Sequence, residues 1–209
     1  DNHKRNSAAV NSIRIMEGIS AVILAGGRAR RFGGTDKTNI IIEGKTIFER
    51  ITSVIEGLFG EIIVVSNNPE SFVSDSRFRT ASDHFSGFGP LAGIHSGLKS
   101  CTGTAAFVFA GDMPFLSREI IMEMISVFET SDKSILVPMM RGNSEPLHAI
   151  YSCSLAGNIE RFIAEGRSNA VRDFFENENF AYFNVSETDE NRLAFTNINS
   201  PDDLKGTNR

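Results

Sequence analysis

The feature that most constrains the fold is a series of short apolar runs that alternate with segments of helical spacing. The first strong run, ISAVILA at 19–25, ends at Gly26 and Gly27. Such a run is typical of a central strand in a parallel sheet, which is buried on both faces. The alternation along the chain predicts an α/β fold with a doubly wound parallel sheet.

Further strands and helices follow from the same patterns and from their capping residues. Thr46 and Glu49 are expected to form a capping box, and Ser117 is expected to be an N-cap. Ser200, which precedes Pro201, is expected to mark the start of a helix. Strands are predicted at 39–42, 61–65, 78–81, 105–110, 135–137, 147–151 and 181–185. Helices are predicted at 46–58, 91–99, 117–128, 155–164, 171–175 and 202–204.

Composition indicates one domain and excludes several classes of protein. The polar residues 1–17 are interpreted as a flexible N-terminal extension, and 18–209 as a single domain. A net charge of −5 argues against a nucleic-acid partner. Cys101 and Cys153 lack zinc-site spacing and are expected to be reduced thiols. The sequence has neither an apolar run of about 18 residues nor a secretory signal. We therefore expect a cytoplasmic location and no association with a membrane.

The loop 24–37, which follows the first strand, combines glycines with clustered arginines and ends at Lys37. Glycines let backbone N–H groups approach phosphate oxygens, and arginines neutralise them, so the loop predicts a triphosphate site. It matches neither the Walker A pattern nor the GxGxxG dinucleotide fingerprint. The residues alone also allow an ordinary glycine turn whose arginines point into solvent.

Two later loops carry polar residues that follow strand signals. Asp112, just past the strand 105–110, is a candidate ligand for Mg²⁺, or alternatively a turn residue ahead of Pro114. The loop 82–90 leads into a helix, whose N-terminus and Asp83 are candidates for an anion or a ribose hydroxyl, although an ordinary loop is favoured there. The three histidines that follow residue 80 form no cluster and are expected to be structural or surface residues: His84, His95 and His148.

Together these segments resemble the molybdenum cofactor guanylyltransferases of the MobA family. The resemblance covers about 19–204 and rests on five motifs in order: LAGGRARRFGGTDK at 24–37, GPLAGI at 89–94, GDMPF at 111–115, EPLHAIY at 145–151 and NINSPDDL at 197–204. The pair Gly26-Gly27 favours the guanylyl branch, because cytidylyl and isoprenoid relatives usually carry LAAG at this point. The resemblance implies a Rossmann-like, mostly parallel sheet in three αβα layers, of the nucleotide-diphospho-sugar transferase type, with 18–209 as one nucleotidyltransferase domain.

The reaction implied by the resemblance transfers GMP from GTP to the terminal phosphate of the molybdopterin cofactor and releases diphosphate, with Mg²⁺ as cofactor. Its catalytic residues would be Arg31 on the phosphates, Lys37, and Asp112 as the metal ligand. The other implied ligands of the nucleotide, the metal or the pterin are Leu24, Ala25, Gly26, Gly27, Asn67, Asp83, Asn197 and Asn199. The substrate's own phosphate is the attacking group, so no protein nucleophile is needed. Protein partners would be other cofactor-biosynthesis or acceptor proteins.

The chain departs from the family pattern at several positions, and two other functions stay open. Phe32 replaces a methionine, Gly111 replaces a frequent cysteine with no expected effect on metal binding, and 166–169 holds one arginine where relatives often have two. A cytidylyltransferase or another small-substrate nucleotidyltransferase would keep the same triphosphate loop and Asp112. A nucleotide-binding partner module without catalysis is the alternative from a different class.

Overall fold

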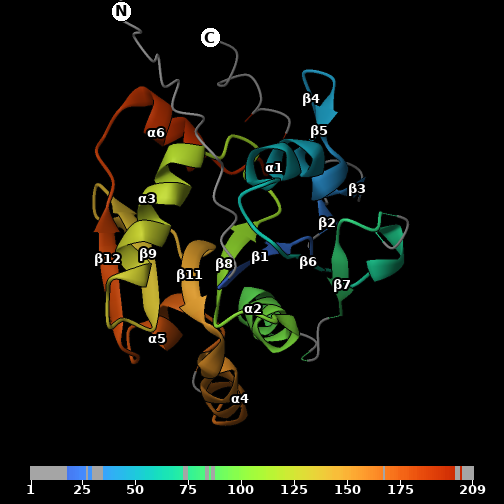
Figure 1. Cartoon of the computed structure of the whole chain (residues 1–209). Helices are drawn as coiled ribbons and strands as arrows, with labels where there is room; N and C mark the ends of the chain where they lie inside the picture. The colour runs from blue at the N-terminus through green and yellow to red at the C-terminus, as the bar shows by residue number, and fades with distance from the viewer. Residues whose placement is uncertain are drawn as a thin grey trace, which may run out of the picture.

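The computed structural model describes residues 18–26, 28–29, 35–72, 75–82, 85, 88–166, 168–200 and 203 (Figure 1). The expected extension 1–17 and most of the expected helix 202–204 lie outside these residues. Within the described part of the chain, no helix combines the length and apolar composition needed to cross a membrane. Cys101 and Cys153 are free thiols, as predicted.

Three parallel strands form the centre of the eight-stranded sheet. Strand β1 (Ile19–Leu24) lies between β8 (Ala105–Ala110) and β6 (Ile62–Val65), and β7 (Arg79–Ala81) extends the sheet beyond β6. Every residue of β1, β6 and β8 is buried, as the continuous apolar runs predicted. Leu24 pairs with both Val65 and Ala110, so the three strands end level with one another.

The other half of the sheet includes an antiparallel hairpin. Strand β9 (Ile135–Met140) turns back into β10 (Asn143–Ser144) and β11 (His148–Ser152), and β11 also pairs antiparallel with β8. Arg141 and Gly142 in the turn have positive φ angles of 53° and 75°, a backbone suited to a tight hairpin. Strand β12 (Phe180–Asn184) runs parallel to β9. The sheet is therefore mostly parallel, and the antiparallel pairs are those made by β10 and β11.

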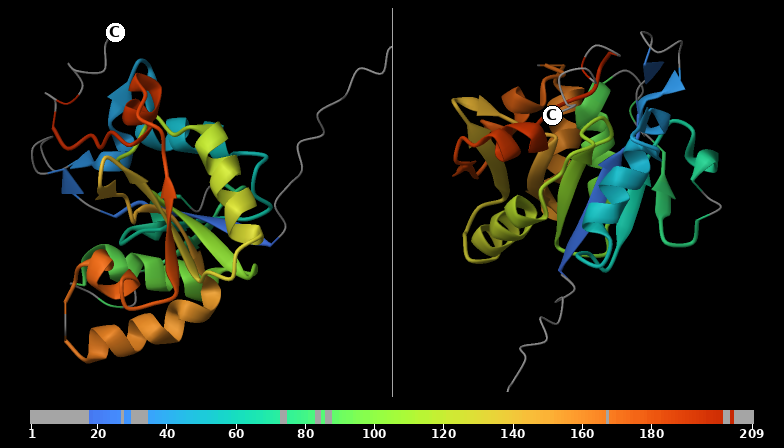
Figure 2. Two further views of the ribbon diagram at one scale, coloured as in Figure 1. Left: turned by 90° about the vertical axis from the view of Figure 1, so that its left-hand side faces the viewer. Right: turned by 90° about the horizontal axis from the view of Figure 1, so that it is seen from above.

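Helices cover both faces of the sheet, which confirms the three-layer, Rossmann-like prediction (Figures 1 and 2). One face is covered by α1 (Ile47–Ile55), α3 (Arg118–Glu129) and α6 (Asp189–Ala194). The other is covered by α2 (Gly89–Ser100), α4 (Ala156–Ala164) and α5 (Val171–Phe175). The remaining short elements are β2 (Arg28–Ala29), β3 (Thr35–Asp36), β4 (Ile41–Ile42), β5 (Lys45–Thr46), η2 (Lys37–Asn39), η3 (Pro69–Ser71) and η4 (Cys153–Leu155).

Local capping chemistry sets the starts of several helices. Thr46 and Glu49 form the expected capping box of α1, and the Ser117 hydroxyl accepts from the backbone N–H of Ile120 at the start of α3. Helix α2 begins two residues earlier than predicted, because Pro90 suits a first helical turn. Helix α6 was not predicted; it is short and capped by Thr188.

Helix α2 lies unusually close to β1. A Cβ atom added at Gly97 would stand 2.5 Å from Cγ1 of Val22, and one added at Gly93 would stand 3.2 Å from Cδ2 of Leu24. Glycine at these two positions therefore allows the helix to approach the strand. This contact places the N-terminal turn of α2 beside the level ends of the central strands.

His148, like His95, is a buried histidine in the described part of the chain. Its ring is 1% exposed and lies against Phe107, Phe109 and Phe195, with centroid separations of 5.0, 5.5 and 5.3 Å. Burial lowers the pKa of His148 from 6.5 to about 3. The imidazole is therefore neutral in the folded protein, and the expectation of a structural histidine is confirmed.

This burial predicts a loss of stability in mild acid. Between pH 6.5 and about 3 the unfolded chain binds a proton at His148 that the folded protein does not, so the free energy of unfolding should fall as pH falls through this window. The slope from this group is up to about 1.4 kcal/mol per pH unit. Denaturant titrations at pH 7, 5.5 and 4 should show a shallower slope in His148→Phe and His148→Leu. An unchanged slope in both variants would contradict the assignment.

Candidate functional site

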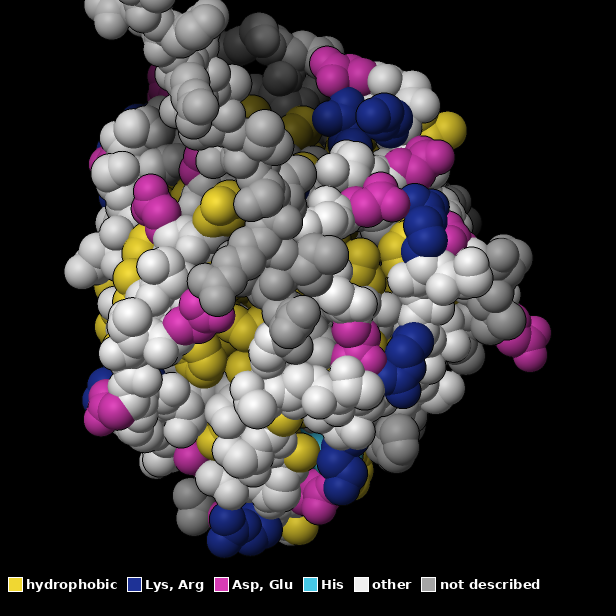
Figure 3. All heavy atoms as spheres, viewed as in Figure 1, with side chains coloured by type: hydrophobic (Ala, Val, Ile, Leu, Met, Phe, Trp, Pro, Cys, Tyr) yellow, Lys and Arg dark blue, Asp and Glu magenta, His cyan; other side chains and the backbone are white. Residues whose placement is uncertain are grey.

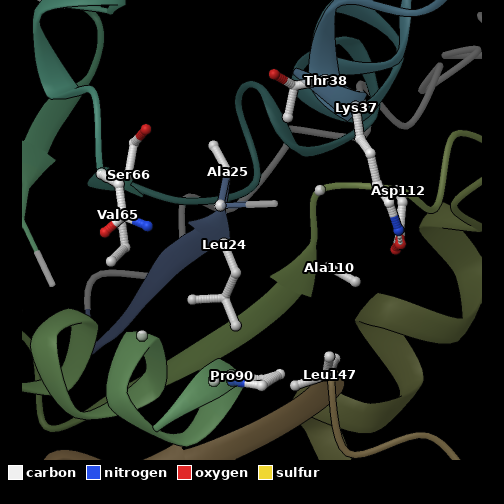
Figure 4. A pocket seen from close by; sticks show the side chains of 15 residues that line it. Leu24, Ala25, Lys37, Thr38, Val65, Ser66, Pro90, Ala110, Asp112 and Leu147 are labelled. Atoms are coloured by element: carbon white, nitrogen blue, oxygen red, sulfur yellow. Dashed lines mark hydrogen bonds and ion pairs between the residues drawn. The ribbon is translucent and has the colours of Figure 1, made fainter. Parts of the chain in front are cut away.

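The principal described pocket, of about 510 Å³, opens where the central strands end, the usual ligand position in an open α/β sheet (Figure 4). Its volume suits a small organic ligand. The residues that line it come from the ends of β1, β6 and β8 and the positions just after them, from η2, from the N-terminal part of α2 and from the position before β11: Leu24, Ala25, Gly26, Lys37, Thr38, Val65, Ser66, Asn67, Gly89, Pro90, Gly93, Ala110, Gly111, Asp112 and Leu147.

Backbone hydrogen bonds carry the sheet slightly past the ends of its strands and fix the pocket floor. Ala25 N–H donates to the carbonyl of Val65 at 2.9 Å, and Gly111 N–H donates to the carbonyl of Leu24 at 3.1 Å. A Cβ atom added at Gly111 would lie 2.5 Å from the Leu24 carbonyl oxygen and 3.3 Å from Cα of Ala25. Glycine at 111 is thus required for the chain after β8 to lie against the chain after β1, a constraint that the sequence did not reveal.

A cluster of three polar side chains lies at one margin of the pocket. Nζ of Lys37 lies 2.7 Å from Oδ2 of Asp112 and donates to Oδ1 of Asn199 at 2.5 Å. The Lys37 and Asp112 side chains are 24% and 21% exposed, so the ion pair is partly shielded but still reaches solvent. Figure 4 shows Lys37 extending from η2 to meet Asp112 beyond the end of β8.

The C-terminal segment is attached to this cluster by its backbone as well. Ile198 N–H donates to the carbonyl of Asp112 at 2.8 Å, and the backbone N–H groups of Asn199 and Ser200 both donate to Oδ2 of Asp203. Ile198 is fully buried. This backbone attachment brings Asn199 to Lys37.

Glu145 is a second carboxylate near Asp112 to which the sequence gave no role. Burial raises the pKa of Glu145, and hydrogen bonds from the Leu147 N–H and from Asn197 offset only part of that rise, to which the charge of Asp112 adds. The Leu147 N–H donates to Oε1 of Glu145 at 3.3 Å. The hydroxyl of Tyr151, itself fully buried, donates to the carbonyl of Pro146 at 2.8 Å and holds the same loop. Glu145 is the first residue of the EPLHAIY motif, and this motif is the sequence signal that could have identified it.

The structure brings most of the described candidate residues together. Six of them line the pocket: Leu24, Ala25, Gly26, Lys37, Asn67 and Asp112. Asn199 joins them through Lys37, and Asn197 lies at the margin beside Glu145. Gly27, Arg31 and Asp83 lie outside the described residues. The sequence missed the contributions to the pocket of Thr38, Ser66 and Leu147, whereas the N-terminus of α2, which also lines the pocket, was among the candidates.

Comparison with known proteins identifies the family. Residues 21–181 match the MobA-like NTP transferase domain. The chain belongs to this family. A protein described as "probable molybdenum cofactor guanylyltransferase" from Natranaerobius thermophilus is 35% identical, over 90% of this chain and 94% of the relative. A molybdenum cofactor guanylyltransferase from Desulfosudis oleivorans is 31% identical, over 91% and 94% of the two chains.

Comparison with solved structures supports the same family. The crystal structure of molybdopterin-guanine dinucleotide biosynthesis protein A from Archaeoglobus fulgidus superposes with a TM-score of 0.77 at 30% identity, covering 90% of this chain and 95% of that one. The MobA-like fold therefore extends over most of the chain, including the strand ends that form the pocket.

The close approach at Gly111 predicts a specific intolerance to a side chain. Gly111→Ala should lower the free energy of unfolding by about 1–3 kcal/mol and weaken nucleotide binding, because its Cβ would collide with the Leu24 carbonyl. Gly157→Ala is the matched control, since a Cβ at this exposed position in α4 meets nothing within 4 Å. Denaturant unfolding and equilibrium GTP titration measure both effects. Equal stability and affinity in the two variants would contradict the constraint.

Proposed function

We propose that this MobA-like transferase moves GMP from GTP to the terminal phosphate of the molybdopterin cofactor, giving the guanine dinucleotide cofactor and diphosphate. The observation that carries the proposal is the Lys37–Asp112–Asn199 cluster at the margin of a pocket formed by strand ends. The names and the 30–35% identity of the relatives support the choice of base and acceptor.

The proposed reaction requires that the two substrates be positioned and that the negative charge of their phosphates be neutralised. An oxygen of the acceptor phosphate forms a bond to the α-phosphorus of GTP, and the bond from that phosphorus to the diphosphate breaks. A phosphate monoester is largely dianionic near pH 7, so the attacking oxygen needs no base. Side chains that hold two anionic substrates together therefore account for catalysis without a protein nucleophile.

Lys37 is the described cation best placed for the triphosphate. Its ammonium group has three N–H donors, and Asp112 and Asn199 accept two of them. These contacts hold Lys37 at the pocket margin before a nucleotide arrives and leave one donor for a phosphate oxygen. The ion pair itself adds little to stability, since partly exposed pairs contribute about 0–1 kcal/mol.

The residues at this margin fit Mg²⁺, which is part of the proposal. The ion prefers one or two carboxylates and completes its octahedral shell with phosphate oxygens and water. Asp112 supplies a partly exposed carboxylate, and Asn199 supplies an amide oxygen beside it. Among the described residues no group of three acidic, histidine or cysteine side chains gathers for a metal, at this margin or elsewhere, so phosphate oxygens and water would supply the remaining ligands. When bound, the ion would neutralise phosphate charge that develops during transfer.

The proposal predicts a loss of turnover without a loss of fold in Asp112→Asn and Asp112→Ala. Diphosphate release with GTP, Mg²⁺ and the molybdopterin cofactor should fall at least about 100-fold, because Asp112 would hold the Mg²⁺ that neutralises the phosphates, and loss of one preorganised electrostatic contact costs on the order of 3 kcal/mol. The thermal midpoint should change little, since Asp112 is partly exposed. The matched control is Asp132→Asn, in which the altered carboxylate is 85% exposed and remote from the pocket. Full turnover in both Asp112 variants would contradict the role assigned to Asp112.

The same assay separates the alternative functions. The unaltered chain should release diphosphate with GTP in preference to CTP, ATP or UTP. Release with CTP alone would replace the guanylyl assignment with a cytidylyl one. Nucleotide binding without diphosphate release, with any of the four, would support a partner module without catalysis.

A further inference from the structure

Arg172 is an exposed arginine of α5 that is held by a neutral side chain. Its Nη2 donates to Oγ of Ser144 in β10 at 2.6 Å. The contact joins elements 28 positions apart in the sequence and orients the guanidinium. A guanidinium has five N–H donors in a planar fork, so one hydroxyl leaves most of that donor capacity unused.

Most other described cations have carboxylate partners, as the neighbouring blue and magenta side chains in Figure 3 illustrate. Arg77, for example, pairs with Asp75 and Glu56. Among described side chains, the cations without a carboxylate within 4.0 Å are Lys45, Arg118, Arg161 and Arg172. Arg118 donates to the carbonyl of Val54, and Arg161 to Oδ1 of Asn158.

Of these cations, Arg172 is attached to the loop that borders the pocket. Ser144 directly precedes Glu145, and the negative charge of Asp112 contributes to the raised pKa of the Glu145 carboxyl group. Leu147, three residues after Ser144, lines the pocket, and its carbonyl accepts from Ala110 N–H at 2.7 Å. Helix α5 covers the same face of the sheet as α2, whose first turn forms a pocket wall. Arg172 thus stands on the β10–β11 side of the site, across from the β6 and β7 side.

Charge balance gives this position a role. Glu145, which has no cationic partner among the described residues, places a carboxyl group at this border, and an ionised carboxylate there would repel an approaching phosphate dianion. Lys37 is already engaged by Asp112 and Asn199. Arg172 is the described cation on the β10–β11 side without a carboxylate partner, so it can offset that repulsion.

We propose that Arg172, oriented by Ser144, binds a phosphate of the incoming acceptor on the β10–β11 side of the pocket. The proposal rests on the function proposed above, in which the acceptor attacks through a phosphate. The guanidinium fork matches the geometry of phosphate oxygens, and the Ser144 hydroxyl accepts from Arg172 while its own proton is available to a second oxygen. Arg172 is therefore a positioning residue for the acceptor, separate from the nucleotide contacts.

The test is a comparison of KM for the acceptor with the affinity for GTP. Arg172→Ala should raise KM for the molybdopterin cofactor about 10- to 100-fold, the loss expected for a hydrogen bond to a charged group, and should leave GTP affinity and the thermal midpoint unchanged. Arg172→Lys should recover part of the loss, and Ser144→Ala should raise KM less. Arg161→Ala is the matched control, because this arginine is also held by a neutral side chain but lies in α4.

A second readout does not depend on turnover. Titration with inorganic phosphate, followed by NMR of the arginine side-chain N–H groups, should shift the Arg172 signal more than that of Arg161. An unchanged acceptor KM in an active Arg172→Ala variant would overturn this proposal and leave the proposed function intact. A failure of the unaltered chain to release diphosphate with any nucleotide would instead overturn the proposed function, and the acceptor assignment with it.

Discussion

The site depends on one constraint, which is that the three central parallel strands end level with one another. Leu24 pairs with Val65 on one side and with Ala110 on the other. Because all three chains leave the sheet at the same edge, the residues that follow them converge on one space. The glycines at 93, 97 and 111 then let α2 and the segment after β8 lie against β1 without a side chain between them. A shift of one residue in this register would separate the groups that line the pocket.

The polar cluster is a product of long-range assembly. Lys37 meets Asp112 from 75 positions away and Asn199 from 162 positions away. Such contacts add little to stability at partly exposed positions, but they limit the positions that a flexible lysine can occupy. The backbone bond from Ile198 to Asp112 strengthens the arrangement, because it attaches the last described segment to the edge of the sheet. The cluster thus helps to position groups before a substrate binds.

Two titratable groups, His148, which is buried, and Glu145, which is partly buried, show how environment separates structural from site residues. His148 is enclosed by phenylalanine rings, which leave its charged form without compensation, and burial lowers its pKa to about 3. Glu145 also meets a desolvating environment, but it lies among hydrogen-bond donors and beside Asp112 at the pocket margin. Burial alone therefore does not mark a functional residue; contact with other polar groups at the pocket margin does.

The sequence by itself determined the order of the principal strands and helices other than α6, the capping of α1 and α3, and the loops in which the candidate residues lie. These features follow from apolar periodicity and local hydrogen bonding, which act over a few residues. It did not reveal the antiparallel hairpin through β10 and β11, the need for glycine at 111, the proximity of Glu145 to Asp112, or the link between Arg172 and Ser144. Each of these depends on which distant segments become neighbours in space, and only the tertiary structure decides that, because the registers of the strands set those distances.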